Sequence, residues 1–123
     1  ATLALLNCYN SRTGWRQYAN LSKMYDGAVA RAQQLGYLVE EFWLNDPEVS
    51  MDRLRRTLLS RGIPGILMAF VPDRGDPVEK LRSFDFTGFA CATLGWRMED
   101  LNIHSCSNDQ YHSGLLATQK LIQ

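Results

Sequence analysis

Aromatic, amide and carboxylate side chains gather directly after the apolar runs of this sequence. An aromatic ring can stack on the apolar face of a small molecule, and amide or carboxylate groups can fix its pattern of hydroxyls or amines. If the apolar runs are parallel strands, these side chains meet at one edge of a sheet, where such folds bind ligands. The candidates are Tyr9, Asn10, Ser11, Arg12, Trp15, Phe70, Asp73, Thr93, Trp96, Asn108 and Asp109.

Other chemistries have little support in the sequence. His104 and His112 lie eight residues apart with no convergent cysteine or carboxylate pair, so we expect no metal site. Ser105 and Ser107 lack the glycines of a nucleophile elbow. The turn Ser11-Arg-Thr-Gly14 is similar to a phosphate-binding turn but lacks the second glycine and the lysine of a P-loop. We therefore expect neither a cofactor nor an enzymatic activity.

Composition indicates one ordinary globular domain. The 123 residues include 13 basic and 13 acidic side chains, so the formal net charge is zero and a nucleic-acid surface within this segment is not expected. No apolar run approaches the roughly 20 residues of a membrane span. The cysteines Cys8, Cys91 and Cys106 are odd in number and lie in or beside apolar runs. Buried, reduced thiols in the cytoplasm are the expected state.

Hydrophobic periodicity predicts an alternation of strands and helices. Apolar positions from Tyr18 to Leu35 recur at spacings of three and four, and Gly36 is a natural helix stop. Ser50 is a candidate N-cap for a helix through Arg61, and Asp76-Pro-Val-Glu79 is typical of a capping box. Strands are expected at 3–8, 37–43, 63–70, 86–93 and 103–107, and a closing helix after 108.

This order predicts an α/β fold: an open, mostly parallel five-stranded sheet with helices on both faces. Four arginines lie on or near the helix expected at 50–61, which is typical either of a solvated face or of a subunit interface. They are Arg53, Arg55, Arg56 and Arg61.

Three passages resemble the effector-binding core of lac-repressor/galactose-repressor-type bacterial transcription regulators. Asp26-Gly-Ala-Val-Ala-Arg-Ala-Gln-Gln-Leu-Gly-Tyr37 is similar to the first helix of that core, and Leu58-Leu-Ser-Arg-Gly-Ile-Pro-Gly-Ile-Leu-Met-Ala69 to its passage into the third strand. The passage from Asn108 to Ile122 resembles the turn and helix that close the amino-terminal lobe, with Asn-Asp here where the family has Asp-Asn.

The resemblance implies that residues 1–123 are the amino-terminal lobe of a two-lobed, periplasmic-binding-protein-like domain that binds a small effector, most commonly a sugar, in the interlobe cleft. It also implies a helix-turn-helix DNA-binding domain before this segment, a second lobe after it, and a cytoplasmic homodimer. The effector contacts it implies are Tyr9, Asn10, Trp15, Tyr18, Met68, Phe70, Asn108 and Asp109, with Met51, Arg55 and Leu58 at the dimer interface.

Two other interpretations remain open at this stage. A periplasmic solute-binding protein has the same lobe and would carry an export signal. A flavodoxin-like electron carrier would place the FMN phosphate on Ser11-Arg-Thr-Gly14 and the flavin ring against Trp15 or Trp96.

Overall fold

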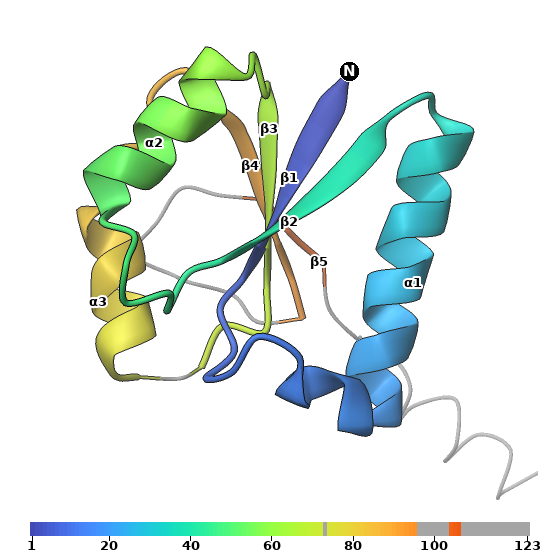
Figure 1. Cartoon of the computed structure of the whole chain (residues 1–123). Helices are drawn as coiled ribbons and strands as arrows, with labels where there is room; N and C mark the ends of the chain where they lie inside the picture. Colours follow the sequence, from blue (N-terminus) through green and yellow to red (C-terminus); the bar gives the residue numbers. More distant parts are fainter. Residues whose placement is uncertain (73, 96–103, 107–123) are drawn as a thin grey trace, which may run out of the picture.

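A computed structural model describes residues 1–72, 74–95 and 104–106, the last three by their backbone. Figure 1 shows a twisted parallel sheet with α1 on one face and α2 and α3 on the other. The elements in chain order are β1 (Thr2–Asn7), the 3₁₀ helix η1 (Gly14–Gln17), α1 (Ala19–Gln34), β2 (Leu38–Trp43), α2 (Met51–Ser60), β3 (Gly65–Ala69), α3 (Asp76–Ser83), β4 (Ala90–Leu94) and β5 (His104–Cys106). The predicted open α/β sheet is confirmed.

The strand order within the sheet is β2-β1-β3-β4-β5, and every pairing is parallel. After β1 the chain crosses one face to add β2 on one side, and it then returns to add β3 on the other side. The direction of strand addition therefore reverses between β1 and β3. Ligands of open α/β sheets bind at such a switch point, beyond the carboxyl ends of the strands.

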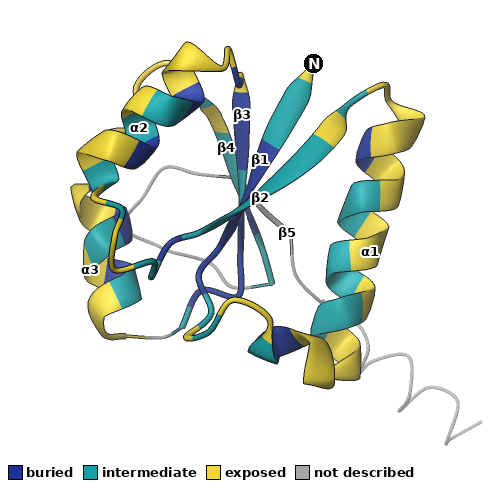
Figure 2. Cartoon of the chain, in the orientation of Figure 1, coloured by how far each residue is buried: buried dark blue, intermediate teal, exposed yellow. Residues whose placement is uncertain are grey.

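Side chains alternate between two core layers along each strand, because successive Cβ atoms point to opposite faces of a sheet. The layer beneath α2 and α3 contains Leu6, Met68 and Leu58, whereas Leu5 and Ala69 belong to the layer beneath α1. Figure 2 shows β1 and β3 as the most deeply buried strands, between less buried neighbours. Their continuous apolar sequences are typical of central parallel strands.

Local sequence signals account for most of the element ends. Gly36 and Gly62, which follow α1 and α2, have φ angles of 88° and 66°, a region that glycine enters without steric cost. The predicted N-cap of α2 is confirmed, because Ser50 Oγ accepts a hydrogen bond from the Arg53 N–H at 3.1 Å.

Two local predictions were wrong. The capping box at the start of α3 is not formed: Gly75 is the N-cap, without a side-chain hydrogen bond, and Asp76 is the first helical residue. The fourth strand begins at Ala90 rather than at Phe86. Phe86 and Phe89 instead pack on Phe84 from a loop, with ring centroids 4.8 and 6.3 Å away, so their apolar character reflects burial rather than strand pairing.

Candidate functional site

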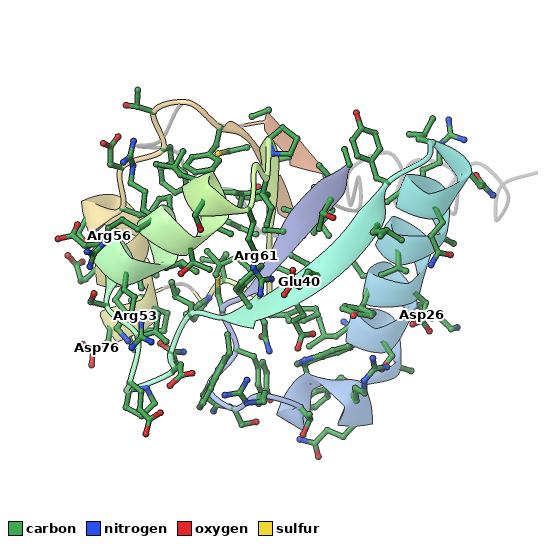
Figure 3. All side chains as sticks on the ribbon, turned by 45° about the horizontal axis from the view of Figure 1, so that its top comes forward. Asp26, Glu40, Arg53, Arg56, Arg61 and Asp76 are labelled. Atoms are coloured by element: carbon green, nitrogen blue, oxygen red, sulfur yellow. The ribbon has the colours of Figure 1, made fainter. Side chains whose placement is uncertain are left out.

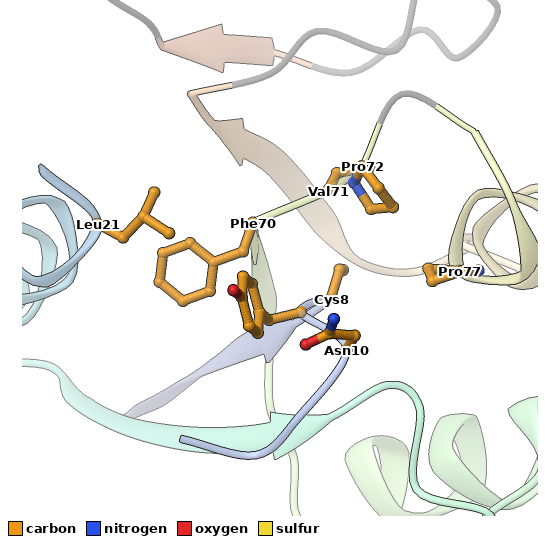
Figure 4. A pocket seen from close by; sticks show the side chains of 8 residues that line it. Cys8, Asn10, Leu21, Phe70, Val71, Pro72 and Pro77 are labelled. Atoms are coloured by element: carbon orange, nitrogen blue, oxygen red, sulfur yellow. The ribbon is translucent and has the colours of Figure 1, made fainter. Parts of the chain in front are cut away.

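A cavity of about 340 Å³ opens at the carboxyl ends of β1 and β3, at the switch point of the sheet (Figure 4). This volume lies near the lower end of the range of small-molecule sites. Its walls are mainly apolar and aromatic, and none of the lining residues that the structure describes carries a charged side chain. They are Cys8, Tyr9, Asn10, Leu21, Phe70, Val71, Pro72 and Pro77.

Asn7, the last residue of β1, fixes the loop that forms one wall of the cavity. Its side chain is fully buried and donates from Nδ2 to the Arg12 carbonyl at 2.9 Å, while its Oδ1 accepts from the Tyr9 N–H at 2.9 Å. The indole Nε1 of Trp15 donates to the same Arg12 carbonyl at 3.2 Å. Because a buried amide requires partners for both its ends, these bonds hold the loop in one conformation.

The backbone of Tyr9 is held from a neighbouring strand as well. Its carbonyl accepts from Trp43 Nε1 at 3.0 Å and from Asn45 Nδ2 at 2.9 Å. Further along the loop, a Cβ at Gly14 would lie 2.3 Å from Ser11 Oγ, which accepts from the Gly14 N–H. A larger residue at position 14 would require the Ser11 hydroxyl to move, so the turn from Ser11 to Gly14 is closely packed.

The two arginines of this loop interact with groups outside the cavity lining. The Arg12 guanidinium lies 5.1 Å from the ring of Trp43 and 3.4 Å from Asp46. That of Arg16 lies 4.4 Å from the ring of Trp15. Burial raises the pKa of the Glu41 carboxyl on β2, and the charges of both arginines oppose this shift. The positive charge of the loop is therefore directed toward β2 and α1, and the cavity wall stays uncharged.

The ionisable groups that do line the cavity are neutral at physiological pH. Burial raises the pKa of the Cys8 thiol to about 12. A side-chain hydrogen bond to Tyr18 is the main cause that raises the pKa of Tyr9 above its ordinary value of 10.0. The described wall is consequently suited to an uncharged ligand with an apolar face.

Phe70 follows β3 in an unusual backbone conformation. Its φ angle is 63°, in the left-handed region, where a bulky residue is a genuine outlier. The ring is buried, stacks on Trp15 with centroids 4.8 Å apart and planes inclined at 27°, and lines the cavity. Trp15 in turn contacts the ring of Tyr25 on α1 at 4.7 Å.

The structure brings together three of the residues expected to contact an effector, since Tyr9, Asn10 and Phe70 all line the cavity. Tyr18 is not in the lining, but its ring lies 6.3 Å from that of Tyr9. Asn108 and Asp109 lie outside the described residues, as do Asp73 and Trp96.

Two expected contact residues lie in the core instead. Trp15 is 1% exposed and Met68 is fully buried, so neither offers a surface to a ligand in this conformation. Trp15 is covered by Phe70 and Tyr25, and Met68 belongs to the layer beneath α2 and α3. Both residues therefore lie in the core and outside the cavity lining.

The residues expected at the dimer interface lie on the side of α2 that packs within the chain. Leu58 is 1% exposed and packs in the core of its own chain, and the half-buried Met51 packs against the same layer. Arg55 donates to the carbonyls of Asp85 and Thr87 at 3.2 and 3.4 Å. The face of α2 that carries these residues is thus covered within the chain, because its apolar side must cover the sheet.

Sequence reasoning missed the other lining residues and the role of Asn7. Cys8, Val71 and Pro72 follow the ends of β1 and β3, whereas Leu21 and Pro77 are brought to the cavity by the packing of α1 and α3. Asn7 could have been found, because an amide inside an otherwise apolar strand must find buried partners.

Among the described residues, no group of three or more histidine, cysteine, aspartate or glutamate side chains is placed to hold a metal ion. In that same part of the chain, no helix is long and apolar enough to cross a membrane.

The chain forms an open, parallel α/β sheet with a cavity at its topological switch point. The chain superposes on the crystal structure of the LacI family transcriptional regulator CcpA from Weissella paramesenteroides, solved with bound glucose, with a TM-score of 0.60 and 14% sequence identity. The match covers 96% of this chain and 41% of the regulator, so the chain spans about two fifths of that protein's length. No family model and no curated protein sequence matches the chain.

The strand order β2-β1-β3-β4-β5 is shared with flavodoxin-like folds, so the flavin interpretation has to be judged on the site. Trp15 is buried behind Phe70 and cannot stack on a flavin, and the Gly14 N–H already donates to Ser11 Oγ rather than facing a phosphate. Both features disfavour an FMN electron carrier.

Proposed function

We propose that this chain is the amino-terminal lobe of the effector-binding core of a LacI-type transcription regulator, and that its effector is a sugar. The observation that carries the proposal is the uncharged, aromatic-walled cavity at the switch point of a lobe with this fold. A second lobe would close over the cavity and complete the site.

The chemistry of the cavity suits a sugar. The CH groups of a pyranose form an apolar face that packs on aromatic rings such as those of Tyr9 and Phe70. The Asn10 amide is exposed at the rim, where it can hydrogen-bond sugar hydroxyls. In this proposal Asn108 and Asp109 supply further polar contacts, and a neutral sugar requires no counter-charge from the uncharged wall.

Regulation would follow from a shift in population between open and closed lobes. A ligand that contacts both lobes stabilises the closed form in proportion to its differential affinity. The closed form would change the spacing of helix-turn-helix domains in a cytoplasmic homodimer, and DNA binding would change with it. For the dimer contact we propose the outward face of α2, where Arg53, Arg56 and the 46% exposed Leu59 remain available.

The test uses the full-length protein and one pair of variants. A thermal-shift screen of neutral sugars, beginning with glucose, is expected to raise the melting temperature, and titration calorimetry then gives a dissociation constant. Asn10→Ala should weaken binding about three- to ten-fold, the value of one hydrogen bond. Asn20→Ala, an exposed site on α1 outside the cavity lining, should leave binding unchanged.

A screen in which no sugar stabilises the protein would refute a sugar effector. Equal weakening by both asparagine variants would show that the sugar binds elsewhere. A yellow protein with flavin absorbance would replace the proposal by the electron-carrier alternative.

A further inference from the structure

The position of the Phe70 ring departs from the alternation of its strand. Met68 belongs to the core layer beneath α2 and α3, and Ala69 to the layer beneath α1. Strand alternation would return residue 70 to the α2 and α3 side. Phe70 instead shares the layer of Ala69, and Val71 lies in the other one. The left-handed φ of 63° at Phe70 is the local cause of this reversal.

A left-handed conformation at a phenylalanine is unfavourable, so tertiary contacts must maintain it. Trp15 supplies the principal one, since its ring stacks on Phe70 at 4.8 Å. Trp15 is itself held by its hydrogen bond to the Arg12 carbonyl, by Tyr25 and by the Arg16 guanidinium at 4.4 Å. Asn7 fixes the same Arg12 carbonyl from within β1.

We propose that Phe70 is a ring platform for the apolar face of the effector, and that Trp15 is the positioning residue that keeps this platform at the cavity. This inference rests on the proposed function, which supplies the nature of the ligand. It adds an explanation of how the site would select that ligand. Phe70 lines the cavity beside Leu21 of α1 (Figure 4), and Tyr9 of the loop after β1 belongs to the same lining. Trp15 stacks on the ring of Phe70 and is absent from the lining.

The platform defines a class of ligand. A closed ring with an apolar face, such as a pyranose in its chair form, gains contact from Phe70, whereas an acyclic polyol with the same number of carbons cannot present one continuous face. Glucose and sorbitol are therefore the appropriate pair of probes, because they differ chiefly in ring closure and both are uncharged.

The experiment compares Trp15→Leu with Trp15→Phe and with Trp43→Phe in the full-length protein. Trp43 lies on β2 and donates a hydrogen bond to the Tyr9 carbonyl, but among the described residues it is Trp15, and not Trp43, that stacks on Phe70. The Trp43 variant therefore controls for general loosening of the loop. Two readouts are required: the φ angle of residue 70 in a crystal structure of each variant, and the dissociation constants for glucose and sorbitol.

Trp15→Leu is expected to move Phe70 to a negative φ and to weaken glucose binding at least ten-fold. Trp15→Phe, which keeps a ring behind Phe70, should retain the positive φ and bind glucose within about three-fold of the wild type. Trp43→Phe should leave the φ of Phe70 positive. The wild type should prefer glucose to sorbitol, and Trp15→Leu should lose that preference.

A positive φ at Phe70 in Trp15→Leu would overturn the positioning role, as would unchanged glucose affinity in that variant. If Trp15→Leu fails to fold, Trp15→Met serves as the variant without a ring: a negative φ at residue 70 with weakened glucose binding is expected of it, and a positive φ would overturn the positioning role. Failure of the wild type to bind either probe would contradict the ring platform and the sugar effector together. The φ of residue 70 would then still decide whether Trp15 holds Phe70 in place.

Discussion

Replacing Asn7 by alanine is predicted to destabilise the fold by about 3 kcal/mol. The variant removes the acceptor of the part-buried Tyr9 N–H, which costs roughly 1–3 kcal/mol, and one hydrogen bond to the Arg12 carbonyl, which contributes about 1 kcal/mol. The Arg12 carbonyl keeps the hydrogen bond from Trp15 Nε1, so the free-energy loss at this carbonyl is smaller than the loss at the Tyr9 N–H. A fully buried site leaves no room for water to compensate without rearrangement.

Urea unfolding followed by tryptophan fluorescence measures this change. With a slope of about 2 kcal/mol per molar urea, the midpoint should fall by roughly 1.5 M at an unchanged slope. Asn10→Ala is the matched control, because the same side chain is removed three residues later from an exposed position; it should change stability by less than about 0.5 kcal/mol. Comparable midpoints for the two variants would refute the assigned role of Asn7.

Asn7→Asp refines the test through its pH dependence. The carboxyl group retains an acceptor for the Tyr9 N–H but would place negative charge against the Arg12 carbonyl in a buried site, so its pKa in the folded state should lie above the value in the unfolded state. A raised folded pKa means that the folded state binds the proton more tightly. The variant should therefore approach wild-type stability near pH 4 and lose stability as the pH rises toward 7.

Three further predictions follow from the backbone and from the buried thiol. Gly27→Ala should stabilise the fold by about 0.5–1 kcal/mol in urea unfolding, because a Cβ at this position on α1 meets open space. Gly95→Ala should destabilise it by about 1–2 kcal/mol, because Gly95 has a φ of 88° and a Cβ there would lie 3.0 Å from Met24 Cε. Equal effects of the two variants would contradict the backbone conformations assigned to these glycines. Ser50→Ala should cost about 1 kcal/mol by removing the N-cap of α2, and unchanged amide-exchange protection in the first turn would count against this. Burial raises the folded pKa of the Cys8 thiol from 9.0 to about 12, so its contribution to stability is complete below pH 9 and is lost as the pH rises toward 12. Cys8→Ala should flatten the decline in melting temperature between pH 9 and 12. An unchanged decline would refute the raised pKa of Cys8.

Much of the fold was predictable because its signals are local. The helix expected from Tyr18 to Leu35 is α1, Ala19–Gln34, and the N-cap at Ser50 begins α2 as expected. Periodicity predicts these helices because one face of each must be apolar to cover the sheet. The start of the fourth strand was mispredicted at Phe86, because an apolar run has the same composition whether it pairs in a sheet or packs beneath a loop.

The candidate site was predictable in position but not in composition. Tyr9, Asn10 and Phe70 follow strands that end at the switch point, and topology alone brings them to one edge. Nothing in the sequence distinguishes these residues from Trp15 and Met68, which also lie near strand ends but are buried. Exposure depends on which elements cover a residue, and that information is non-local.

The sequence by itself determined the alternation of strands and helices, the edge of the sheet where a ligand would bind, and the resemblance that indicated a regulator lobe. Only the tertiary structure decided which side chains form the wall of the cavity. The physical reason is clearest at Phe70, whose left-handed backbone places its ring in the layer of Ala69, stacked on Trp15. Local propensity disfavours this conformation, and contacts between residues distant in the chain maintain it.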